Sequence, residues 1–422
     1  MDIKKPRGTN DFYGDKVILM RKIEDIVTQL CKSYGIDEIR TPMFESTELF
    51  VRGVGDTTDI VQKEMFTFED RGGRSLTLKP EGTAGAARAF IESGLYSEAQ
   101  PTKLYYITSC FRNERPQAGR YKQFHQFGVE FFGSYSASAD AELISFMHEV
   151  LQRLNIKNTT LKINSLGGNE CRIKYNNILK EYINNKLDCL CEDCQARSVK
   201  NPLRILDCKN PNCKEILADA PAVLDVLDEE CKAHFNGLMS SLDAMGIKYE
   251  VDKSIVRGLD YYTRTVFEFV SNEIGSQGTI CGGGRYDNLV KEVGGSNMGA
   301  VGFAMGIERI MLLLEAQKGN SVKANTPVIY IGSMGDAGSL KAQELAYKLR
   351  KEGINAQSDI VGRSIKAQMK YADKIGAKYN IVIGENEIET DVVNLKDMIE
   401  GGSVQIKISN LLEEIKNRLE EK

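Results

Sequence analysis

One segment of the chain, residues 104–133, limits the possible folds more than any other. A largely apolar stretch, Leu104–Arg112, ends in an arginine, and the polar loop after it contains a proline and a glycine, which interrupt regular structure. A further stretch, Lys122–Phe132, sorts its side chains with the two-residue period of a β-strand. The segment therefore predicts two strands joined by a loop.

The two faces of the second predicted strand differ in chemical character. One face carries Phe127, Val129 and Phe131 and suits a hydrophobic core. The other face carries a ring that can stack on a base, a glycine that leaves room, and an amide and a carboxylate that can bind an ammonium or an imidazole N–H. We interpret it as the floor of a pocket, and a solvent-exposed sheet face is the alternative. Its residues are Phe124, Gln126, Gly128 and Glu130.

The composition is that of a globular protein in water. Hydrophobic residues make up 42% and charged residues 27% of the 422 residues, which suffices for two or three domains. No stretch approaches the about 20 apolar residues of a membrane span, and the start Met1–Lys5 lacks an apolar signal region, so we expect a cytoplasmic protein with no membrane association. The net charge of −4 does not indicate nucleic-acid binding, so an RNA partner would require local basic patches.

The order of the predicted elements divides the chain into two domains. A helix begins at Asp15 and ends at Gly35, strands follow, and a charged helix-rich stretch then precedes further strands. Residues 317–326 are polar and indicate a linker, beyond which strands and helices alternate as in a compact α/β domain. We expect a first domain over residues 1–320, with a helical insertion at about residues 170–250, and a second domain over residues 326–422.

The chain lacks the G-x-x-x-x-G-K-[ST] loop that holds phosphates in many nucleotide-binding proteins. The segment Gly53–Gly55 lacks the rest of a dinucleotide-binding fingerprint. The candidates for binding phosphate are therefore arginines, whose guanidinium groups grip phosphate in a bidentate manner and keep their charge at any working pH.

Three segments resemble the motifs of class II aminoacyl-tRNA synthetases. Phe111–Glu114, followed after the loop by Arg120 and Phe124, resembles motif 2, and Gly302–Arg309 resembles motif 3. Glu38–Pro42, after the first helix, resembles motif 1, the dimer-forming element. The class I signatures H-I-G-H and K-M-S-K-S are absent from the sequence.

Four further segments are similar to those of histidyl-tRNA synthetases. Two of them, Val256–Thr265 and Cys281–Asp287, are peculiar to that family within the class, and the others are Pro6–Asp11 and Leu78–Gly85. All seven segments occur in the expected order and cover nearly the whole chain. The resemblance implies an α+β fold: an antiparallel sheet with helices forms the catalytic domain, a helical insertion interrupts it, and a C-terminal α/β domain binds the anticodon.

The resemblance also implies a reaction in two steps. The carboxylate of L-histidine attacks the α-phosphate of ATP and releases pyrophosphate, and the 3′-terminal hydroxyl of the tRNA for histidine then attacks the adenylate. Neither step requires a protein nucleophile, so catalysis would consist mainly of positioning and charge stabilisation. The family requires Mg²⁺ bridging the ATP phosphates, and the motif 1 resemblance implies a homodimer.

The arginines of these motifs are expected to bind ATP. By resemblance, Arg112 would hold the α-phosphate and Phe124 would stack on the adenine. Arg309 would hold the γ-phosphate from the start of a helix, where the helix dipole adds to its charge. Arg257 would bridge the amino-acid carboxylate and the α-phosphate. In isolation, each arginine would be better explained by a surface salt bridge. The implied catalytic pair is Arg112 and Arg257, and the ATP-binding set is Arg112, Glu114, Arg120, Phe124 and Arg309.

Recognition of histidine requires groups for two ring nitrogens and an ammonium. By resemblance, Glu130 would accept one ring N–H and Tyr262 would contact the other nitrogen. A site of paired polar groups rejects analogues, because a wrong ligand leaves these groups buried and unpaired. Ordinary core packing is the alternative for the tyrosines. The ammonium would be bound by Glu81, Thr83 and Gln126, and the pocket would be completed by Gly82, Arg112, Arg257, Tyr261 and Tyr286.

Two groups of residues are candidates for binding tRNA. In the motif 2 loop, Arg115, Gln117 and Arg120 could reach the acceptor end, although Arg120 could contact the ATP phosphates instead. In the second domain, basic residues recur at three- and four-residue spacing and would form one stripe on a helix, in the region that resembles the anticodon-binding domain. A solvated helix face is the alternative. The stripe consists of Arg363, Lys366, Lys370 and Lys374.

Five of the ten cysteines lie between Cys189 and Cys213. Cys191 and Cys194 enclose two residues, Cys208 follows after thirteen more, and four thiolates at such spacing suit a tetrahedral Zn²⁺ in a structural site. Without a signal region a disulfide framework is not expected, and reduced thiols account for the pattern equally well. The resemblance does not support zinc, since metal in such a site is not a general feature of the histidyl family.

Three other functions compete with this interpretation. A catalytically silent paralogue that senses histidine would tend to lack the C-terminal domain and the motif arginines, which this chain has. A synthetase for another amino acid is opposed by Tyr262, Glu130 and the segment around Arg257. A non-enzymatic RNA-binding module would not need the polar strand face.

Overall fold

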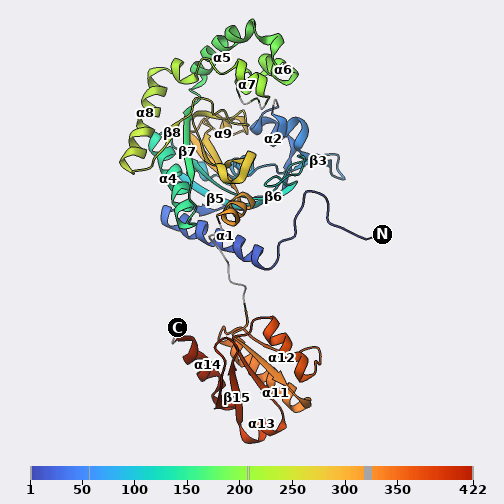
Figure 1. Ribbon diagram of the computed structural model, residues 1–422. Helices are drawn as coiled ribbons and strands as arrows, with labels where there is room; N and C mark the ends of the chain where they lie inside the picture. Colours follow the sequence, from blue (N-terminus) through green and yellow to red (C-terminus); the bar gives the residue numbers. More distant parts are fainter. Residues whose placement is uncertain (1, 57, 207, 209, 318–325, 421–422) are drawn as a thin grey trace. The chain divides into compact units, whose positions relative to one another are not determined.

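The computed structural model describes residues 2–56, 58–206, 208, 210–317 and 326–420. The chain forms two compact units, Met1–Ser321 and Val322–Lys422 (Figure 1). Residues 318–325, which make up most of the predicted linker, lie outside the described residues. Within the described ranges, no helix is both long enough and apolar enough to cross a membrane.

The larger unit is built around a sheet of eight strands in the order β1-β5-β6-β11-β10-β9-β7-β8. The inner strands pair antiparallel, and only the edge strands β1 and β8 run parallel to their neighbours. The predicted α+β fold with an antiparallel sheet is therefore confirmed. The strands are β1 (Asp37–Glu38), β5 (Thr102–Phe111), β6 (Gln123–Phe132), β7 (Thr159–Ser165), β8 (Glu250–Val251), β9 (Thr263–Ser271), β10 (Thr279–Arg285) and β11 (Ala300–Gly306).

The two strands predicted from residues 104–133 are β5 and β6, and both faces of β6 are buried. On the apolar face, Phe127 is fully buried and stacks on Phe146 of helix α4 (Ala137–Arg153). On the polar face, Glu130 is 0% exposed and Gln126 is 6% exposed. The alternative of a solvent-exposed sheet face is thus wrong, and the polar side chains of β6 lie inside the protein.

Helix α1 (Asp15–Tyr34) begins and ends as predicted, and Gly35 closes it in the left-handed conformation with φ of 64°. Its apolar side, which includes Ile23 and Val27, is buried, and the helix packs against α4 and α10 (Ile307–Ala316). A small sheet in the order β2-β4-β3 lies beside α2. The other strands and α-helices of this part are β2 (Phe44–Ser46), α2 (Thr47–Val54), β3 (Phe66–Glu69), β4 (Ser75–Leu78), α3 (Thr83–Glu92) and α9 (Leu289–Glu292).

A run of helices separates β7 from β8, where the sequence predicts an insertion. In Figure 1, α5, α6 and α7 gather at one end of the larger unit, and α8 packs against α4. A short 3-10 turn, η4, connects α6 toward α7. The elements are α5 (Asn169–Asn184), α6 (Glu192–Lys200), η4 (Pro202–Ile205), α7 (Pro211–Ile216) and α8 (Glu229–Ala244).

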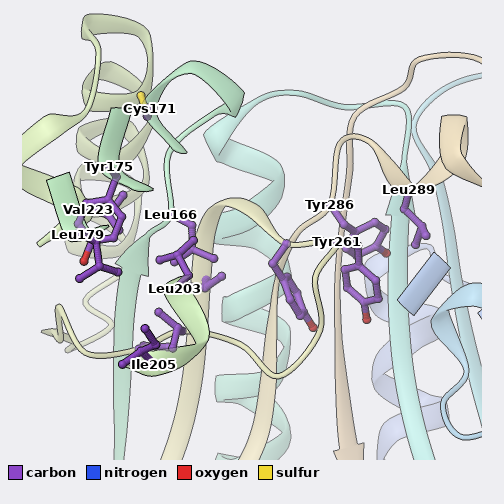
Figure 2. Close-up of a cluster of buried hydrophobic side chains, with 14 of the residues drawn as sticks. Leu166, Cys171, Tyr175, Leu179, Leu203, Ile205, Val223, Tyr261, Tyr286 and Leu289 are labelled. Atoms are coloured by element: carbon purple, nitrogen blue, oxygen red, sulfur yellow. The ribbon is translucent and has the colours of Figure 1, made fainter. Parts of the chain in front are cut away.

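One hydrophobic cluster continues from the insertion to the sheet. Figure 2 shows Tyr175 and Leu179 of α5 and Leu203 of η4 in the same cluster as Tyr261 and Tyr286. Because side chains in a close-packed core restrict one another, the insertion helps to fix the segments on either side of β9 and β10.

The smaller unit has a sheet of five strands in the order β13-β12-β14-β15-β16. The first three strands are parallel, and β15 and β16 are antiparallel. The predicted alternation of strands and helices is confirmed, whereas the hairpin of β15 and β16 was not predicted, because β16 is mostly exposed and lacks an apolar pattern. The elements are β12 (Ile329–Ser333), α11 (Gly335–Lys351), β13 (Ala356–Ser358), α12 (Ile365–Lys374), β14 (Tyr379–Ile383), α13 (Glu385–Thr390), β15 (Val392–Asp397), β16 (Ser403–Lys407) and α14 (Leu411–Glu420).

Candidate active site

Most residues predicted to bind ATP and histidine line one cavity in the larger unit. The segment before α3, the β5–β6 loop, β6, the loop before β9, β10 and the start of α10 all contribute to its walls. The empty space, counted out to the solvent, is about 870 Å³. The predicted residues in the lining are Glu81, Thr83, Arg112, Glu114, Arg120, Phe124, Gln126, Arg257, Tyr261, Tyr262 and Arg309.

Backbone carbonyls hold two of the cavity arginines in place. Nε of Arg112 donates to the carbonyl of Pro80 at 2.9 Å, and Nη1 of Arg309 donates to the carbonyl of Thr279 at 2.7 Å. Burial lowers the pKa of Arg309, and the nearby charges of Arg120 and Arg112 lower it further. This part of the cavity therefore concentrates positive charge, which a bound anion would relieve.

Glu114 lies between two of these arginines. Its carboxylate oxygens are 3.1 Å from Nη1 of Arg120 and 3.8 Å from Nη1 of Arg112. The guanidinium carbon of Arg112 is 5.3 Å from the centre of the Phe124 ring. Nε of Arg120 is buried and has no hydrogen-bond partner in the protein. Arg120 and Phe124 both line the cavity, and an unpaired donor and an aromatic ring in one cavity fit a nucleotide, whose phosphate oxygens and base would contact them.

Arg257 lies over strand β10 and forms an ion pair with Glu268 of β9. Burial opposes its charge, but the carboxylate of Glu268 outweighs burial and raises the pKa of Arg257, which therefore stays protonated. A Cβ atom at Gly282 would come within 2.4 Å of both terminal nitrogens of the guanidinium. Only glycine permits this close approach, so the β10 glycine is needed for the position of Arg257.

Glu130 lies behind the cavity lining and is fully buried. The hydroxyl of Tyr106 donates to its Oε1 at 2.9 Å, and the hydroxyl of Tyr286 donates to its Oε2. Burial raises the pKa of Glu130 to about 8. A carboxyl group with a pKa in this range can become charged when a ligand presents an N–H to it.

The predicted ammonium ligands already make bonds that orient them. The carboxylate of Glu81 accepts the backbone N–H groups of Thr83 and Ala84, each at 2.8 Å, at the start of α3. Oε1 of Gln126 accepts the backbone N–H of Gly82 at 2.9 Å. Glu81 and Gln126 face the cavity, whereas Gly82 stands outside the lining and acts through this backbone bond.

Three predicted tyrosines form a buried aromatic group. The ring centres of Tyr261 and Tyr262 are 4.6 Å apart, and those of Tyr261 and Tyr286 are 5.4 Å apart. Tyr261 and Tyr262 reach the cavity, but Tyr286 does not. Tyr286 packs against Tyr261 and donates its hydroxyl to Glu130, so its role beside bound histidine stays a prediction.

Sequence reasoning missed Tyr106 and Glu268. Tyr106 lies opposite Gly128 in the β5–β6 pair, and a Cβ at Gly128 would come within 2.3 Å of the tyrosine ring. The space that Gly128 leaves is thus filled by protein. A lone carboxylate between Phe267 and Phe269 was the available signal for Glu268, since a charged residue inside an apolar strand requires a partner.

The two groups of tRNA-binding candidates lie on the surface. Arg115 and Gln117 are exposed and do not line the cavity, and the backbone N–H of Arg120 donates to the carbonyl of Gln117 at 2.9 Å within the loop. On α12, Lys366, Lys370 and Lys374 are exposed.

The predicted basic stripe is wrong for Arg363. This residue precedes the helix, because α12 begins at Ile365. Its Nη1 is 2.7 Å from Oδ1 of Asp359, and its guanidinium lies 4.2 Å from the ring centre of Tyr371. The three- and four-residue spacing of basic residues extends beyond the N-terminal end of the helix, so it does not show where the helix begins. It also does not show that Asp359 pairs with Arg363.

The four predicted zinc ligands also come together. The Sγ atoms of Cys191, Cys194, Cys208 and Cys213 all lie within 4.8 Å of one another in the insertion. The exposed Cys189 does not belong to this group.

Two family models match the chain. The histidyl-tRNA synthetase model matches residues 8–310, and the anticodon binding domain model matches residues 328–418. The chain belongs to the histidyl-tRNA synthetase family. The family resemblance inferred from the seven sequence segments is thereby confirmed, and the smaller unit carries the anticodon-binding domain of the family.

Relatives in this family align with the chain over nearly its whole length. The histidine–tRNA ligase of Caldanaerobacter subterraneus subsp. tengcongensis is 52% identical over 414 residues, which are 98% of this chain and 99% of that protein. The histidine–tRNA ligase of Clostridium perfringens is 52% identical over 412 residues, 97% of this chain and 98% of that protein. The crystal structure of apo S. aureus histidyl-tRNA synthetase superposes with a TM-score of 0.84 at 39% identity and covers 98% of this chain and 100% of that chain.

Proposed function

We propose that this synthetase-family chain is a histidine–tRNA ligase that activates L-histidine with ATP and transfers it to the 3′ end of its tRNA. The observation that carries the proposal is one cavity with an arginine cluster in its lining and a buried carboxylate behind its wall. Arg112, Arg257 and Arg309 line it, and Glu130 lies behind its wall. The first group suits phosphates, and the second suits an imidazole N–H.

In the first step, the arginines position ATP and stabilise developing charge. Arg112 binds the α-phosphate, Arg309 binds the γ-phosphate, and the ring of Phe124 stacks on the adenine, with Glu114 and Arg120 completing this end. Arg257 contacts the histidine carboxylate and the α-phosphate as the carboxylate oxygen forms the new P–O bond and pyrophosphate leaves. Since carbonyls already hold Arg112 and Arg309, little reorganisation accompanies the reaction. Mg²⁺, when bound with ATP, would neutralise part of the phosphate charge.

Histidine binds at the other end of the cavity. Its imidazole N–H donates to Glu130, which two tyrosine hydroxyls already orient, and Tyr262 contacts the second ring nitrogen. The ammonium contacts Glu81, Thr83 and Gln126, while Tyr261 packs beside the ring. An amino acid without an N–H at this place leaves Glu130 buried and unpaired, and this penalty excludes it.

The second step brings the tRNA acceptor end to the mouth of the cavity. Arg115 and Gln117 are exposed in the β5–β6 loop beside it and are available to contact the tRNA backbone. The lysines of α12 supply positive charge on the smaller unit, where the anticodon would bind. Transfer of histidine to tRNA takes place where tRNA is used, so this function locates the protein in the cytoplasm.

A homodimer is part of the proposal. The segment that resembles motif 1 leads into β2, where Phe44 is 50% exposed beside Phe68, which is 44% exposed. Exposed aromatic side chains at such a place are typical of a subunit interface. Size-exclusion chromatography with light scattering should give twice the chain mass for the wild type, and Phe44→Asp with Phe68→Asp should give the single mass; a monomeric wild type would refute the dimer.

Aminoacylation tests the proposed function most simply. Labelled histidine should become acid-precipitable with bulk bacterial tRNA only when ATP is present, and tRNA oxidised at its 3′ end with periodate should accept none. The rival function is a silent histidine sensor. Histidine binding without formation of AMP or histidyl-tRNA would favour the sensor and overturn the ligase.

A further inference from the structure

We propose that Cys191, Cys194, Cys208 and Cys213 bind one structural Zn²⁺ ion in the helical insertion. The proposal concerns a site away from the cavity and does not depend on the ligase function. Neither the folding of the sheet nor the reaction described above requires these four thiols to meet.

The distances between the sulfur atoms suit a single tetrahedral ion. Zn–S bonds of about 2.3 Å place the sulfurs of a tetrahedral site about 3.8 Å apart. The Sγ atoms of Cys191 and Cys208 are 3.7 Å apart, and all four Sγ atoms lie within 4.8 Å of one another. The ligands need to contract by a few tenths of an ångström to ~1 Å at most to reach this geometry.

Backbone N–H groups already point at two of the sulfurs. The N–H of Cys191 donates to Sγ of Cys213 at 3.2 Å, and the N–H of Asn210 donates to Sγ of Cys208 at 3.4 Å. Such bonds stabilise thiolate charge and orient metal ligands. Three of the four side chains are buried and Cys191 is half-buried, so the site is closed to solvent as structural zinc sites are.

Neither a disulfide nor an iron–sulfur cluster fits the four thiols as well as zinc does. A disulfide requires sulfurs about 2.05 Å apart, and all four cysteines are free. A four-iron cluster binds each thiolate to a different iron atom, which would separate the sulfurs more widely than observed. Ordinary buried thiols would not need to converge from α6, the turn after η4 and α7.

A second cluster in the insertion provides a contrast. Cys171, Asp228 and Cys231 also lie within ligand distance of one another, but they number only three. Asp228 is the N-cap of α8: its Oδ1 accepts the backbone N–H of Cys231 at 2.7 Å and its Oδ2 accepts the thiol of Cys171 at 3.0 Å. Internal hydrogen bonds therefore account for this cluster without a metal.

The chain between the proposed ligands contacts the loop that carries Arg257. Nδ2 of Asn201 donates to Oδ1 of Asp260 at 2.7 Å, and Nη1 of Arg204 lies 3.5 Å from the carbonyl oxygen of Arg257. Asn201 and Arg204 lie between Cys194 and Cys208 in the chain. An ion bound by these cysteines would therefore hold together the two ends of the segment that contacts this loop. A bound ion outside the cavity would thus help to keep Arg257 in its position.

Metal content tests the proposal on the full-length protein. Protein purified without chelator should contain about one zinc per chain by elemental mass spectrometry. The double variant Cys194→Ser with Cys213→Ser should lose it. Two matched controls should retain it: Cys189→Ser, an exposed cysteine of the same segment, and Cys231→Ser in the second cluster. Iron in place of zinc, or loss of the zinc in Cys231→Ser alone, would contradict the assignment.

Two measurements on the wild-type protein test the proposal even if the double variant fails to fold. Titration of the thiols with an organic mercurial should release zinc, detected by a chromogenic chelator, as about four protected thiols react. Co²⁺ exchanged into the protein should give the intense visible absorption of a tetrahedral thiolate site. Wild-type protein that contains no metal, takes up no Co²⁺ and reacts at all of these cysteines without delay would overturn the proposal.

Discussion

The arginines of the cavity and the lysines of α12 carry the same charge in opposite surroundings. Arg309 is half-buried, held by a backbone carbonyl, and has its pKa lowered by desolvation and by neighbouring arginines. Lys366, Lys370 and Lys374 are exposed on one side of a helix. The first group is fixed before any ligand arrives, whereas the second is free to move in water.

This difference determines what each group can recognise. Fixed charges in a site of low polarity stabilise a particular distribution of ligand charge, and they contribute most when that charge develops in a transition state. Exposed lysines attract a polyanion over a distance of about 10 Å, weakly and with strong dependence on salt. We therefore expect substitutions in the cavity to change the rate of adenylation, and substitutions on α12 to change tRNA affinity alone.

The largest effect is expected from Arg309→Ala. Loss of a positioned donor to a phosphate that gains charge should lower the rate of ATP–pyrophosphate exchange with histidine by roughly 10²- to 10³-fold. Lys374→Ala is the matched control and should leave exchange unchanged, since tRNA is absent from the assay. Equal losses of exchange rate in the two variants would contradict the view that the cavity, and not α12, determines adenylation.

Glu130→Gln is expected to weaken histidine binding. Replacing a carboxylate that accepts a ring N–H with an amide of the same shape should raise the KM for histidine roughly 10- to 100-fold in the exchange assay, because a charged hydrogen bond is lost. The KM for ATP should stay unchanged. A parallel rise in both constants would show that Glu130 supports the fold of the cavity rather than recognition of histidine.

The pH dependence of stability should identify the same carboxyl group. Burial raises the pKa of Glu130 to about 8, so the folded state favours the protonated carboxyl group. The free energy of unfolding therefore falls as the pH rises from the pKa of Glu130 in the unfolded chain to its pKa in the folded protein. Between about pH 5 and about pH 7 the wild type should lose about 2 kcal/mol of unfolding free energy relative to Glu130→Gln. Urea unfolding at both pH values measures this difference. An equal change in the unfolding free energy with pH for the two proteins would contradict the raised pKa.

The smallest effect is expected on α12. Combined replacement of Lys366, Lys370 and Lys374 by alanine should raise the KM for tRNA by roughly fivefold and reduce its dependence on salt, with exchange unaffected. The control is Lys341→Ala with Lys348→Ala on α11, two lysines that pair with Glu344. An equal loss in the control would mean that net charge, and not the α12 surface, governs tRNA binding.

Local patterns predicted the parts of the fold that depend on neighbouring residues. Helix α1 has a regular apolar stripe and a terminal glycine, and the alternation in β6 separated Glu130 from Phe127. The segments that resemble synthetase motifs supplied the cavity arginines. These features could be predicted because the residues that determine them are close together in the chain.

Features that depend on distant partners were not predicted. Tyr106 fills the space at Gly128 only because β5 and β6 pair in one particular register. Glu268 becomes part of the site through an ion pair with a residue of another segment, Arg257. The error at Arg363 has the same origin, since periodicity does not show where a helix begins or which carboxylate neutralises an arginine.

The central claim is that the cavity activates histidine and that Arg257 stabilises the reaction. ATP–pyrophosphate exchange with each of the twenty amino acids, on the wild type and on Arg257→Ala, tests it most directly. We predict exchange with histidine alone, reduced at least about 100-fold in the variant. No exchange with any amino acid by a wild type that still binds histidine would contradict the account and identify a histidine sensor instead.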